Sequence, residues 1–273
     1  MNDPHDLELR LLVDAIYQRY HYDFRHYAMV SLRRRMAAAT ARFGAKTLSE
    51  LQGRILREPA LFAQLLDYLT VQVSEMFRDP AYFLALRREV LPRLQTFPSF
   101  KIWVAGCSNG EEAYSLAILL QEAGLLPRAM IYATDINATS LERARAGVFP
   151  LARMADFSAA YQRAGGQAPF SDYYTANYGN ALMDKALRKA IVFADHSLAT
   201  DSVFAEVQFV SCRNVLIYFD RALQDRALGL FRDALPVGGF LGIGSRESVR
   251  FSAHAAAFRE VAGPERIYQR VRD

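Results

Sequence analysis

The sequence predicts an α/β protein in which an all-helical N-terminal domain precedes a doubly wound, largely parallel sheet. Residues 1–70 carry apolar side chains at three- and four-residue spacings, with no strand-like run between them. From Lys101 onward, short apolar runs alternate with helical patterns, which is typical of a doubly wound sheet. Between about 150 and 198 this alternation is interrupted by tyrosine-rich segments with turn signals. We therefore expect a small inserted antiparallel β-subdomain at about 170–198.

The N-terminal part is expected to be a domain of four helices. These helices are predicted over 7–20, from Phe24 to about Phe43, over 48–56 and over 59–70. Asp23 is placed to cap the second helix, Gly44 is placed to end it, and Pro59 suits the first turn of the fourth. Residues 71–100 would then form a linker and a long helix from about Pro80 to Leu94.

Residues 101–273 are predicted to form the α/β domain. Its strands are expected over 101–105, 129–136, 207–212, 238–245 and 266–272. Its helices are expected over 111–124, 137–147 and 221–235.

The composition is that of an ordinary globular protein. The 273 residues are 52% hydrophobic and 23% charged, and a net charge of +4 does not by itself indicate nucleic-acid binding. No apolar run approaches the roughly 18 residues of a membrane span, and acids stand where a signal peptide would be basic. Two cysteines fit a reducing compartment better than a disulfide framework. We expect a cytoplasmic protein, a monomer, with no nucleic-acid partner and no membrane insertion.

A glycine turn, Gly106 to Gly110, joins the strand at 101–105 to the helix that begins with Glu111 and Glu112. The turn lacks both the dinucleotide glycine fingerprint and the lysine of a P-loop. The alternatives are that the glycines serve only to satisfy positive φ angles and that one carboxylate serves only to cap the helix. The pair of carboxylates, however, would repel a pyrophosphate and attract a cationic group, so the ligand is expected to be positively charged there.

Asp135 lies at the carboxyl end of the next strand, where an acid commonly binds the two hydroxyls of a ribose. The alternative is that it caps the helix at 137–147. A ribose-binding acid beside a loop that favours cations indicates S-adenosylmethionine (SAM). That cofactor carries a ribose, a sulfonium and an ammonium but no phosphate.

A third strand ends at Cys212, and the polar residues that follow it suggest a loop over a reaction centre. Tyr218 in this loop is either a packing residue or a residue of the site. Cys107 and Cys212 are expected to be buried reduced thiols. No metal site is expected, because partners of suitable spacing are missing.

Four motifs, CSNGEEAYSLA, ATDIN, CRNVLIYFD and SEMFRD, together resemble the chemotaxis receptor glutamate O-methyltransferases, the CheR family. The resemblance spans nearly the whole chain and includes DFRHYAMVSLRRRM and the closing ERIYQRV. It implies a helical domain on a SAM-dependent methyltransferase domain with a small β-subdomain. It also implies methyl transfer to receptor glutamates, with S-adenosylhomocysteine as product and the cytoplasmic domain of a chemoreceptor as partner.

The resemblance also implies roles for individual residues. The implied cofactor contacts are Gln72, Ser74, Arg78, Gly106, Glu112, Asp135, Ser197, Leu198, Arg213 and Asn214. Glu112 would bind the methionine ammonium, Asp135 the ribose, and Ser197 with Leu198 would flank the adenine. Arg78 and Tyr218 would act in catalysis, with Tyr218 near the transferred methyl. The sequence departs from the usual pattern at Gln72, Ser74, Asn109 and Ser197, and Ser197 is shorter than the asparagine it replaces.

Residues 23–57 contain eight basic residues and two acidic ones, with Arg33, Arg34 and Arg35 in an unbroken run. A charge run often forms only a solvated helix face. In the family, however, this domain faces the acidic methylation region of the receptor, so the three arginines are predicted to dock the substrate.

Two other functions are open on the sequence. One is a regulatory module that binds SAM but has weakened catalysis. The other, a nicotinamide oxidoreductase, is disfavoured by the missing glycine fingerprint.

Overall fold

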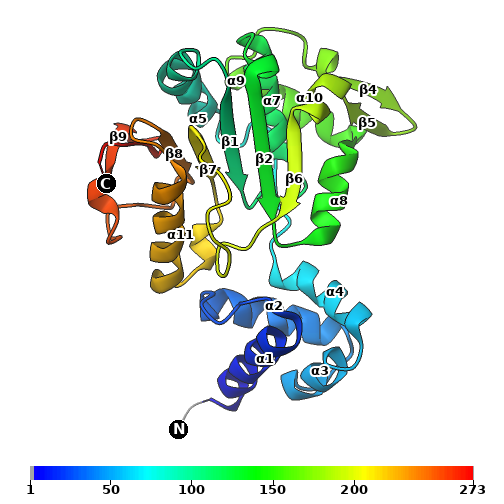
Figure 1. Ribbon diagram of the computed structural model, residues 1–273. Helices are drawn as coiled ribbons and strands as arrows, with labels where there is room; N and C mark the ends of the chain where they lie inside the picture. The colour runs from blue at the N-terminus through cyan, green and yellow to red at the C-terminus, as the bar shows by residue number, and fades with distance from the viewer. Residues whose placement is uncertain (1–2, 273) are drawn as a thin grey trace.

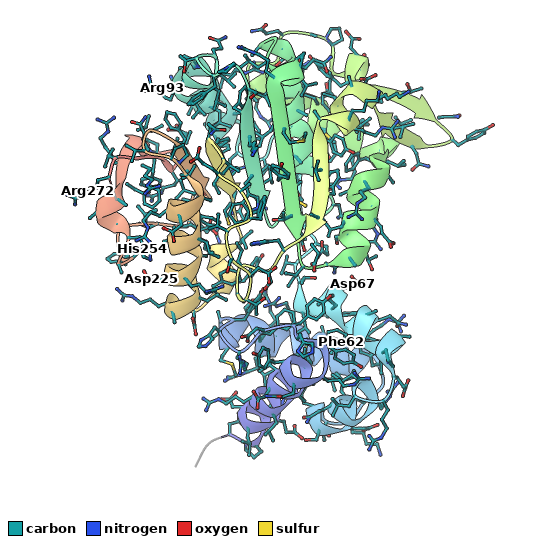
Figure 2. The ribbon with its side chains drawn as sticks, viewed as in Figure 1. Phe62, Asp67, Arg93, Asp225, His254 and Arg272 are labelled. Carbon is teal, nitrogen blue, oxygen red and sulfur yellow. The ribbon has the colours of Figure 1, made fainter. Side chains whose placement is uncertain are left out.

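The computed structural model describes residues 3–272, and it consists of a helical domain and an α/β domain (Figure 1). The helical domain contains α1 (Pro4–Tyr20), α2 (Met29–Arg42), α3 (Leu48–Ile55) and α4 (Pro59–Leu69). These helices enclose a core of their own. Within it Phe62 stacks on Tyr20 with ring centroids 3.9 Å apart (Figure 2). Pro59 occupies the first turn of α4, as the sequence predicts.

The start of α2 differs from the prediction, because the helix begins at Met29 rather than at Phe24. Asp23 is not its cap and instead accepts hydrogen bonds from the backbone and side chain of Arg25. The intervening residues pair with the α/β domain. The amide of Ala28 donates to the carbonyl of Tyr218 at 2.8 Å. A pairing between segments about 190 residues apart leaves no trace in local periodicity.

The long helix after the linker contains one irregular turn. It runs as α5 (Pro80–Ala85), a π-helical turn η1 (Leu86–Val90) and α6 (Leu91–Leu94). Pro92 has no N–H to donate to the carbonyl of Arg88, and its ring would collide with that carbonyl in an ordinary α-helix. The wider turn just before the proline accommodates it.

The α/β domain is built on a seven-stranded sheet in the order β6-β2-β1-β7-β8-β10-β9. The strands are β1 (Phe100–Ala105), β2 (Ala129–Asp135), β6 (Ile191–Asp195), β7 (Phe209–Cys212), β8 (Phe240–Ile243), β9 (Phe258–Ala262) and β10 (Ile267–Arg270). Strands β6, β2, β1, β7 and β8 are parallel, and β10 is antiparallel to both β8 and β9. The predicted doubly wound, largely parallel sheet is confirmed.

Helices cover both faces of this sheet. They are α7 (Glu111–Glu122), α8 (Ala138–Ala146), α9 (Met154–Arg163), α10 (Lys185–Lys189) and α11 (Arg221–Ala234). Alternate residues of β1 belong to different cores, as the period of a strand requires. Ile102 and Val104 pack in the core that includes α7, whereas Trp103 and Ala105 pack in the core that includes α11. Short 3₁₀ turns complete the domain at η2 (Leu126–Arg128), η3 (Leu151–Arg153), η4 (Phe170–Tyr173), η5 (Leu216–Tyr218) and η6 (Ala255–Ala257).

The predicted antiparallel β-subdomain is present, but its limits differ from 170–198. It is a three-stranded sheet of β3 (Val148–Pro150), β5 (Asn180–Met183) and β4 (Tyr174–Asn177). Residues 191–195 form β6, which pairs in parallel with β2 and so belongs to the main sheet. As the edge strand, β6 has alternating burial. Its apolar run at 191–194 predicts a strand, but a local run does not show which sheet the strand joins.

The helical domain lies at the carboxyl ends of the parallel strands. In Figure 1 the arrowheads of β1, β2 and β6 point toward α2 and α4. The side-chain amide of Asn137, just after β2, donates to Asp67 of α4 at 2.9 Å (Figure 2). Within residues 3–272, no helix is both long and apolar enough to cross a bilayer.

Candidate active site

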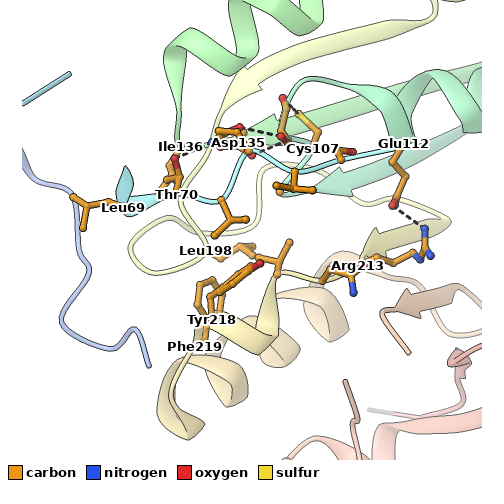
Figure 3. A pocket seen from close by; sticks show the side chains of 18 of the residues that line it. Leu69, Thr70, Cys107, Glu112, Asp135, Ile136, Leu198, Arg213, Tyr218 and Phe219 are labelled. Carbon is orange, nitrogen blue, oxygen red and sulfur yellow. Dashed lines mark hydrogen bonds and ion pairs between the residues drawn. The ribbon is translucent and has the colours of Figure 1, made fainter. Parts of the chain in front are cut away.

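A cavity of about 360 Å³ opens between the carboxyl ends of β1, β2 and β7, the linker after α4, and the helical domain. Its volume lies in the range of small-molecule sites, about 300–1,000 Å³. Figure 3 shows Asp135 and Glu112 on one side, with Tyr218, Phe219 and Arg213 facing them from the other. The cavity lies where a doubly wound sheet usually binds its ligand.

The glycine turn forms part of the cavity wall. Gly106 has a φ of +75°, and a Cβ at this position would lie 2.4 Å from a methyl group of Val215. Gly110 has a φ of +92° and precedes the first residue of α7. Both glycines are therefore required by the backbone. The hydroxyl of Ser108 donates to Gln72 of the linker at 2.9 Å, which holds the turn against it.

Asp135 is fixed at the end of β2 by two backbone amides. Its Oδ2 accepts from the amide of Ser108 at 2.8 Å, and its Oδ1 accepts from the amide of Asn137 at 2.9 Å. Burial raises the pKa of Asp135, and these hydrogen bonds oppose the rise. The cap of α8 is Asn137, whose side chain accepts from the amide of Ser140, so the capping role considered for Asp135 is wrong. Each carboxylate oxygen has further lone pairs for a ligand at the cavity wall.

The two acids at the start of α7 have different surroundings. Glu112 lines the cavity, where its Oε1 accepts from Ser211 at 2.6 Å and its Oε2 pairs with Arg213 at 3.1 Å. Glu111 is fully buried and pairs with Arg153 at 2.9 Å. Burial raises the pKa of Glu111. Consecutive helical residues point about 100° apart, so only one of the pair can face the cavity.

Arg213 connects the strand β7 to the linker. Its guanidinium pairs with Glu112, pairs with Asp79 at 2.8 Å, and donates to the carbonyl of Arg78 at 2.7 Å. It also lies 4.1 Å from the ring centroid of Tyr82. Because two carboxylates balance its charge, Arg213 orders the cavity wall without presenting an unpaired cation to a ligand.

The linker brings Gln72, Ser74 and Arg78 into the cavity wall. Its backbone is strained around Arg78, because Phe77 and Asp79 on either side have φ angles of 54° and 56°. Within residues 3–272, seven non-glycine residues have positive φ, and Ser108 and Asn214 at the cavity are two more of them. Strain of this kind gathers at functional sites, where the surrounding structure holds it in place.

Two family models match this chain. The model described as "CheR methyltransferase, SAM binding domain" matches residues 72–267, and "CheR methyltransferase, all-alpha domain" matches residues 7–70. The chain belongs to the CheR methyltransferase family. Members of this family are SAM-dependent methyltransferases, and SAM is the cofactor of this chain.

Relatives cover most of this CheR chain. It is 57% identical over 265 residues to "Putative methyltransferase Cher3" of Pseudomonas putida, with 97% of each chain covered. It is 33% identical over 205 residues to "Chemotaxis protein methyltransferase 2" of Pseudomonas aeruginosa, covering 72% of this chain and 71% of that one. A solved structure, PKMT2 from Rickettsia typhi in complex with AdoHcy, is 12% identical at a TM-score of 0.33. That match covers 54% of this chain and 21% of that one.

The cavity of this CheR methyltransferase suits SAM in its charges. Two carboxylates, Glu112 and Asp135, line the cavity, and backbone amides orient both oxygens of Asp135. Among the residues that the structure describes, no lysine lines the cavity, which agrees with a cofactor that lacks phosphate. Leu198 and Ile136 supply apolar surface on the Asp135 side (Figure 3).

Cys107 and Cys212 are buried free thiols, as expected. Burial raises the pKa of both well above the ordinary value, which makes them poor nucleophiles. Cys107 lines the cavity beside Glu112 (Figure 3).

The three consecutive arginines do not form one surface, which corrects the prediction that treats them as a unit. Arg33 and Arg34 are exposed, and Arg33 pairs with Asp6 at 2.5 Å. Arg35 turns into the cavity wall, donates to the carbonyl of Leu69, and lies 5.5 Å from the ring centroid of Tyr218. Burial lowers the pKa of Arg35. Three successive residues of a helix span about 200°, so one of them has to point inward.

Among the remaining predicted residues, Leu198, Asn214 and Tyr218 line the cavity, whereas Ser197 does not. The hydroxyl of Ser197 accepts from the amide of Ala199 at 3.3 Å, and its own amide donates to Asp201 at 2.9 Å. The side chain is thus used by its own loop. A contact of Ser197 with the cofactor finds no support in this geometry.

His196 lines the cavity next to Leu198, and the sequence gives no signal for it. Its ring packs edge-on against Trp103 and Phe204, with centroids 5.1 and 5.3 Å away. Its Nε2 lies 3.0 Å from the carbonyl of Ser202, and because a carbonyl only accepts, Nε2 carries the hydrogen. A single histidine outside any motif can be recognised as a cavity residue only when the position of the strand β6 is known.

Proposed function

We propose that this protein transfers a methyl group from SAM to glutamate carboxylates of the cytoplasmic domain of chemoreceptors, giving glutamate methyl esters. One observation carries the proposal: the cofactor cavity is acidic on one side and carries arginines on the other. Asp135 and Glu112 lie on the cofactor side, while Arg35 and Arg78 come from the helical domain and the linker. The names of relatives as chemotaxis protein methyltransferases support the same substrate class. The proposed activity is that of a protein-glutamate O-methyltransferase acting in the cytoplasm.

The acidic side would hold the cofactor. Asp135 would accept the two ribose hydroxyls, and Glu112 would bind the ammonium of the methionine moiety. When bound, SAM supplies an electrophilic methyl group on a positively charged sulfur. The fixed backbone amides on Asp135 and the ion pair on Glu112 keep both carboxylates oriented before the ligand arrives, which lowers the entropy lost on binding.

The cationic side would orient the acceptor. A glutamate with an ordinary pKa of about 4.3 is ionised at neutral pH, so its oxygen can attack without a general base. Arg78 forms no ion pair within residues 3–272 and is available to orient that carboxylate. Tyr218 would fix the geometry of attack from the opposite wall. Neither residue needs to exchange a proton, and positioning alone can supply several kcal/mol, about 7–11 at the upper limit.

The strength of the cationic contact matters, because the reaction removes charge. A carboxylate and a sulfonium give two neutral products, so charge decreases in the transition state. A cation that gripped the acceptor tightly would stabilise the ground state more than the transition state. Because Arg35 already donates to two backbone carbonyls, it would orient the acceptor carboxylate by its charge without binding it tightly. Exclusion of water from the closed cavity would favour the loss of charge.

The outer face of α2 is suited to an acidic helical partner. Val30 is 82% exposed, and Arg34, Ala37 and Ala41 are exposed at helical spacing along the same face. Small side chains let another helix approach closely, while Arg34 and Arg42 would attract its carboxylates.

A transfer assay tests the proposal. The protein is incubated with isotopically labelled SAM and the purified cytoplasmic fragment of a chemoreceptor, and labelled peptides of the fragment are mapped. We expect label on glutamates of the receptor helices. SAM binding without transfer to any receptor would instead support the regulatory module, and transfer to lysine or arginine side chains would refute the proposed substrate class.

A further inference from the structure

Glu247 is a buried carboxylate that belongs to none of the sequence motifs. It lies in the turn after β8, is 5% exposed and forms no ion pair within residues 3–272. Its Oε2 accepts from the amides of Gly244 at 2.6 Å and Asn214 at 3.1 Å, and its Oε1 accepts from the amide of Ile217 at 3.2 Å. Burial raises the pKa of Glu247, and the backbone amides oppose the rise.

Two of these amides belong to the loop that forms one wall of the cofactor cavity. Asn214, Val215 and Tyr218 of this loop line the cavity. Asn214 has a φ of 60°, and Ile217 directly precedes Tyr218. Glu247 therefore holds the loop at both ends of the stretch that connects the two site residues.

The loop is also held from α11 (Arg221–Ala234), because Nε2 of Gln224 donates to the carbonyls of Leu216 at 2.9 Å and Phe219 at 3.1 Å. A second cavity of about 370 Å³ lies on its other side, lined by Leu216, Ile217 and Glu247 together with residues of α11. The loop is thus a wall between two cavities, and Leu216 packs in the core that includes α11. Among the hydrogen bonds of the loop, those to Glu247 are the ones that fix the amides of Asn214 and Ile217.

The turn that carries Glu247 is itself anchored. Gly244 leaves room for the carboxylate, because a Cβ at this position would lie 2.8 Å from both the amide nitrogen of Asn214 and Oε2 of Glu247. Further along, Asp225 of α11 accepts from the hydroxyl of Ser252 at 2.6 Å and from the amide of Ala253 at 2.8 Å (Figure 2). Asp225 therefore ties the segment at 252–253, a few residues after Glu247, to α11.

We propose that Glu247 is a positioning residue for methyl transfer, which fixes Asn214 against the cofactor and Tyr218 against the acceptor through their backbone. Glu247 does not line the cofactor cavity, so it acts only through the loop. The half of the proposal that concerns Tyr218 rests on the proposed function, whereas the half that concerns Asn214 needs only SAM binding.

The test compares Glu247→Gln with a matched Glu206→Gln control. In Glu247→Gln an NH₂ group replaces one oxygen and faces a backbone N–H, so at least one loop contact is lost. Glu206 is exposed beside the amino ends of β1 and β2, away from the carboxyl ends that form the cavity. We expect hydrogen exchange of the peptide 213–219 to be about tenfold faster or more in Glu247→Gln and unchanged in the control. Glu247→Asp, one methylene shorter, should lie between the wild type and Glu247→Gln.

Ligand binding and turnover decide whether the effect is functional. The Kd for S-adenosylhomocysteine should rise about fivefold or more, and kcat should fall about tenfold, with the KM for the acceptor within about twofold of wild type. Faster exchange with unchanged Kd and kcat would make Glu247 merely structural and overturn the proposal, as would unchanged exchange. If Glu247→Gln does not fold, the same measurements are made on Glu247→Asp. Because exchange and Kd need no acceptor, failure of wild-type receptor methylation would reject the proposed function without deciding this inference.

Discussion

At the scale of single residues, hydrogen bonds determine which polar side chains are available to the cofactor. Asp135 and Ser197 both lie at strand ends beside the cavity, and sequence patterns give both a cofactor role. Asp135 has two backbone amides that orient its oxygens at the cavity wall, whereas the hydroxyl of Ser197 is already bonded within its own loop. The position of a residue in a motif identifies it as a candidate cofactor contact. Only its local hydrogen bonds show whether its side chain is available to the cofactor.

The Asp135→Ala change should weaken cofactor binding. Charge-assisted hydrogen bonds to the ribose contribute about 1.5–3 kcal/mol each, so the loss corresponds to about tenfold or more in Kd. Calorimetry with S-adenosylhomocysteine measures the effect. Because Asp135 also holds Ser108 and Asn137, Asp135→Asn, which keeps one acceptor oxygen, is the milder companion. An unchanged Kd in a folded Asp135→Ala protein would contradict the ribose assignment.

The Ser197→Ala change should leave the Kd for S-adenosylhomocysteine within about twofold of wild type, because surface contacts of this kind contribute little. Leu198→Ala should weaken binding, since it removes apolar surface from the cavity wall. Measured side by side, the two variants test whether the loop after β6 contributes apolar contact rather than a polar one. A tenfold loss in Ser197→Ala would show that the loop rearranges around the cofactor.

The Tyr218→Phe change should reduce turnover more than cofactor affinity. The ring would remain in place beside Arg35, and only the hydroxyl that orients the reacting groups would be lost. One aligning hydrogen bond contributes about 0.5–1.5 kcal/mol, so kcat should fall about two- to tenfold. No new ionisation should appear in the pH profile of kcat. A loss in kcat that changes with pH would instead indicate that Tyr218 exchanges a proton.

At the scale of elements, local sequence patterns predict the helices and the central strands. The limits of other elements depend on pairing between segments that are distant in the chain. The helix α7 and the strand β1 lie within a few residues of their predicted limits, because each is a buried apolar segment next to the glycine turn at 106–110. The edge strand β6 and the start of α2 were mispredicted. The run at 191–194 does not show that β6 pairs with β2 in the main sheet, and the residues before α2 pair instead with the loop at 218–220. Neither cause is visible in a local window of sequence.

The helix α2 divides its arginines between two tasks, and single substitutions should separate them. Arg34→Glu should raise the KM for the receptor and make it less sensitive to salt, without changing the Kd for the cofactor, because Arg34 is exposed. Arg35→Ala should lower kcat, because Arg35 lines the cavity. Steady-state kinetics at two ionic strengths make the comparison. If both changes affected only the KM, Arg35 would be a docking residue after all.

At the scale of the whole molecule, the helical domain closes the site that the sheet begins. The parallel strands supply Asp135, the glycine turn and Arg213, while the linker and α2 supply Arg78 and Arg35. Sequence motifs predict most of the site residues that the parallel strands supply. They do not show that α2 lies over the cavity, because that depends on the pairing of residues 26–28 with 218–220. The same pairing joins the proposed docking helix to the loop that carries Tyr218.

The fate of the transferred methyl group tests the central claim most directly. Receptor fragment labelled by this protein with methyl-labelled SAM is placed in mild alkali, and volatile methanol is collected. A carboxylate acceptor predicts that the label leaves the receptor as methanol, because a methyl ester is hydrolysed there. Label that stays on the receptor through alkali would mean a methylated nitrogen or an ether. That result would contradict the account of a cavity that joins a carboxylate to the methyl group of SAM.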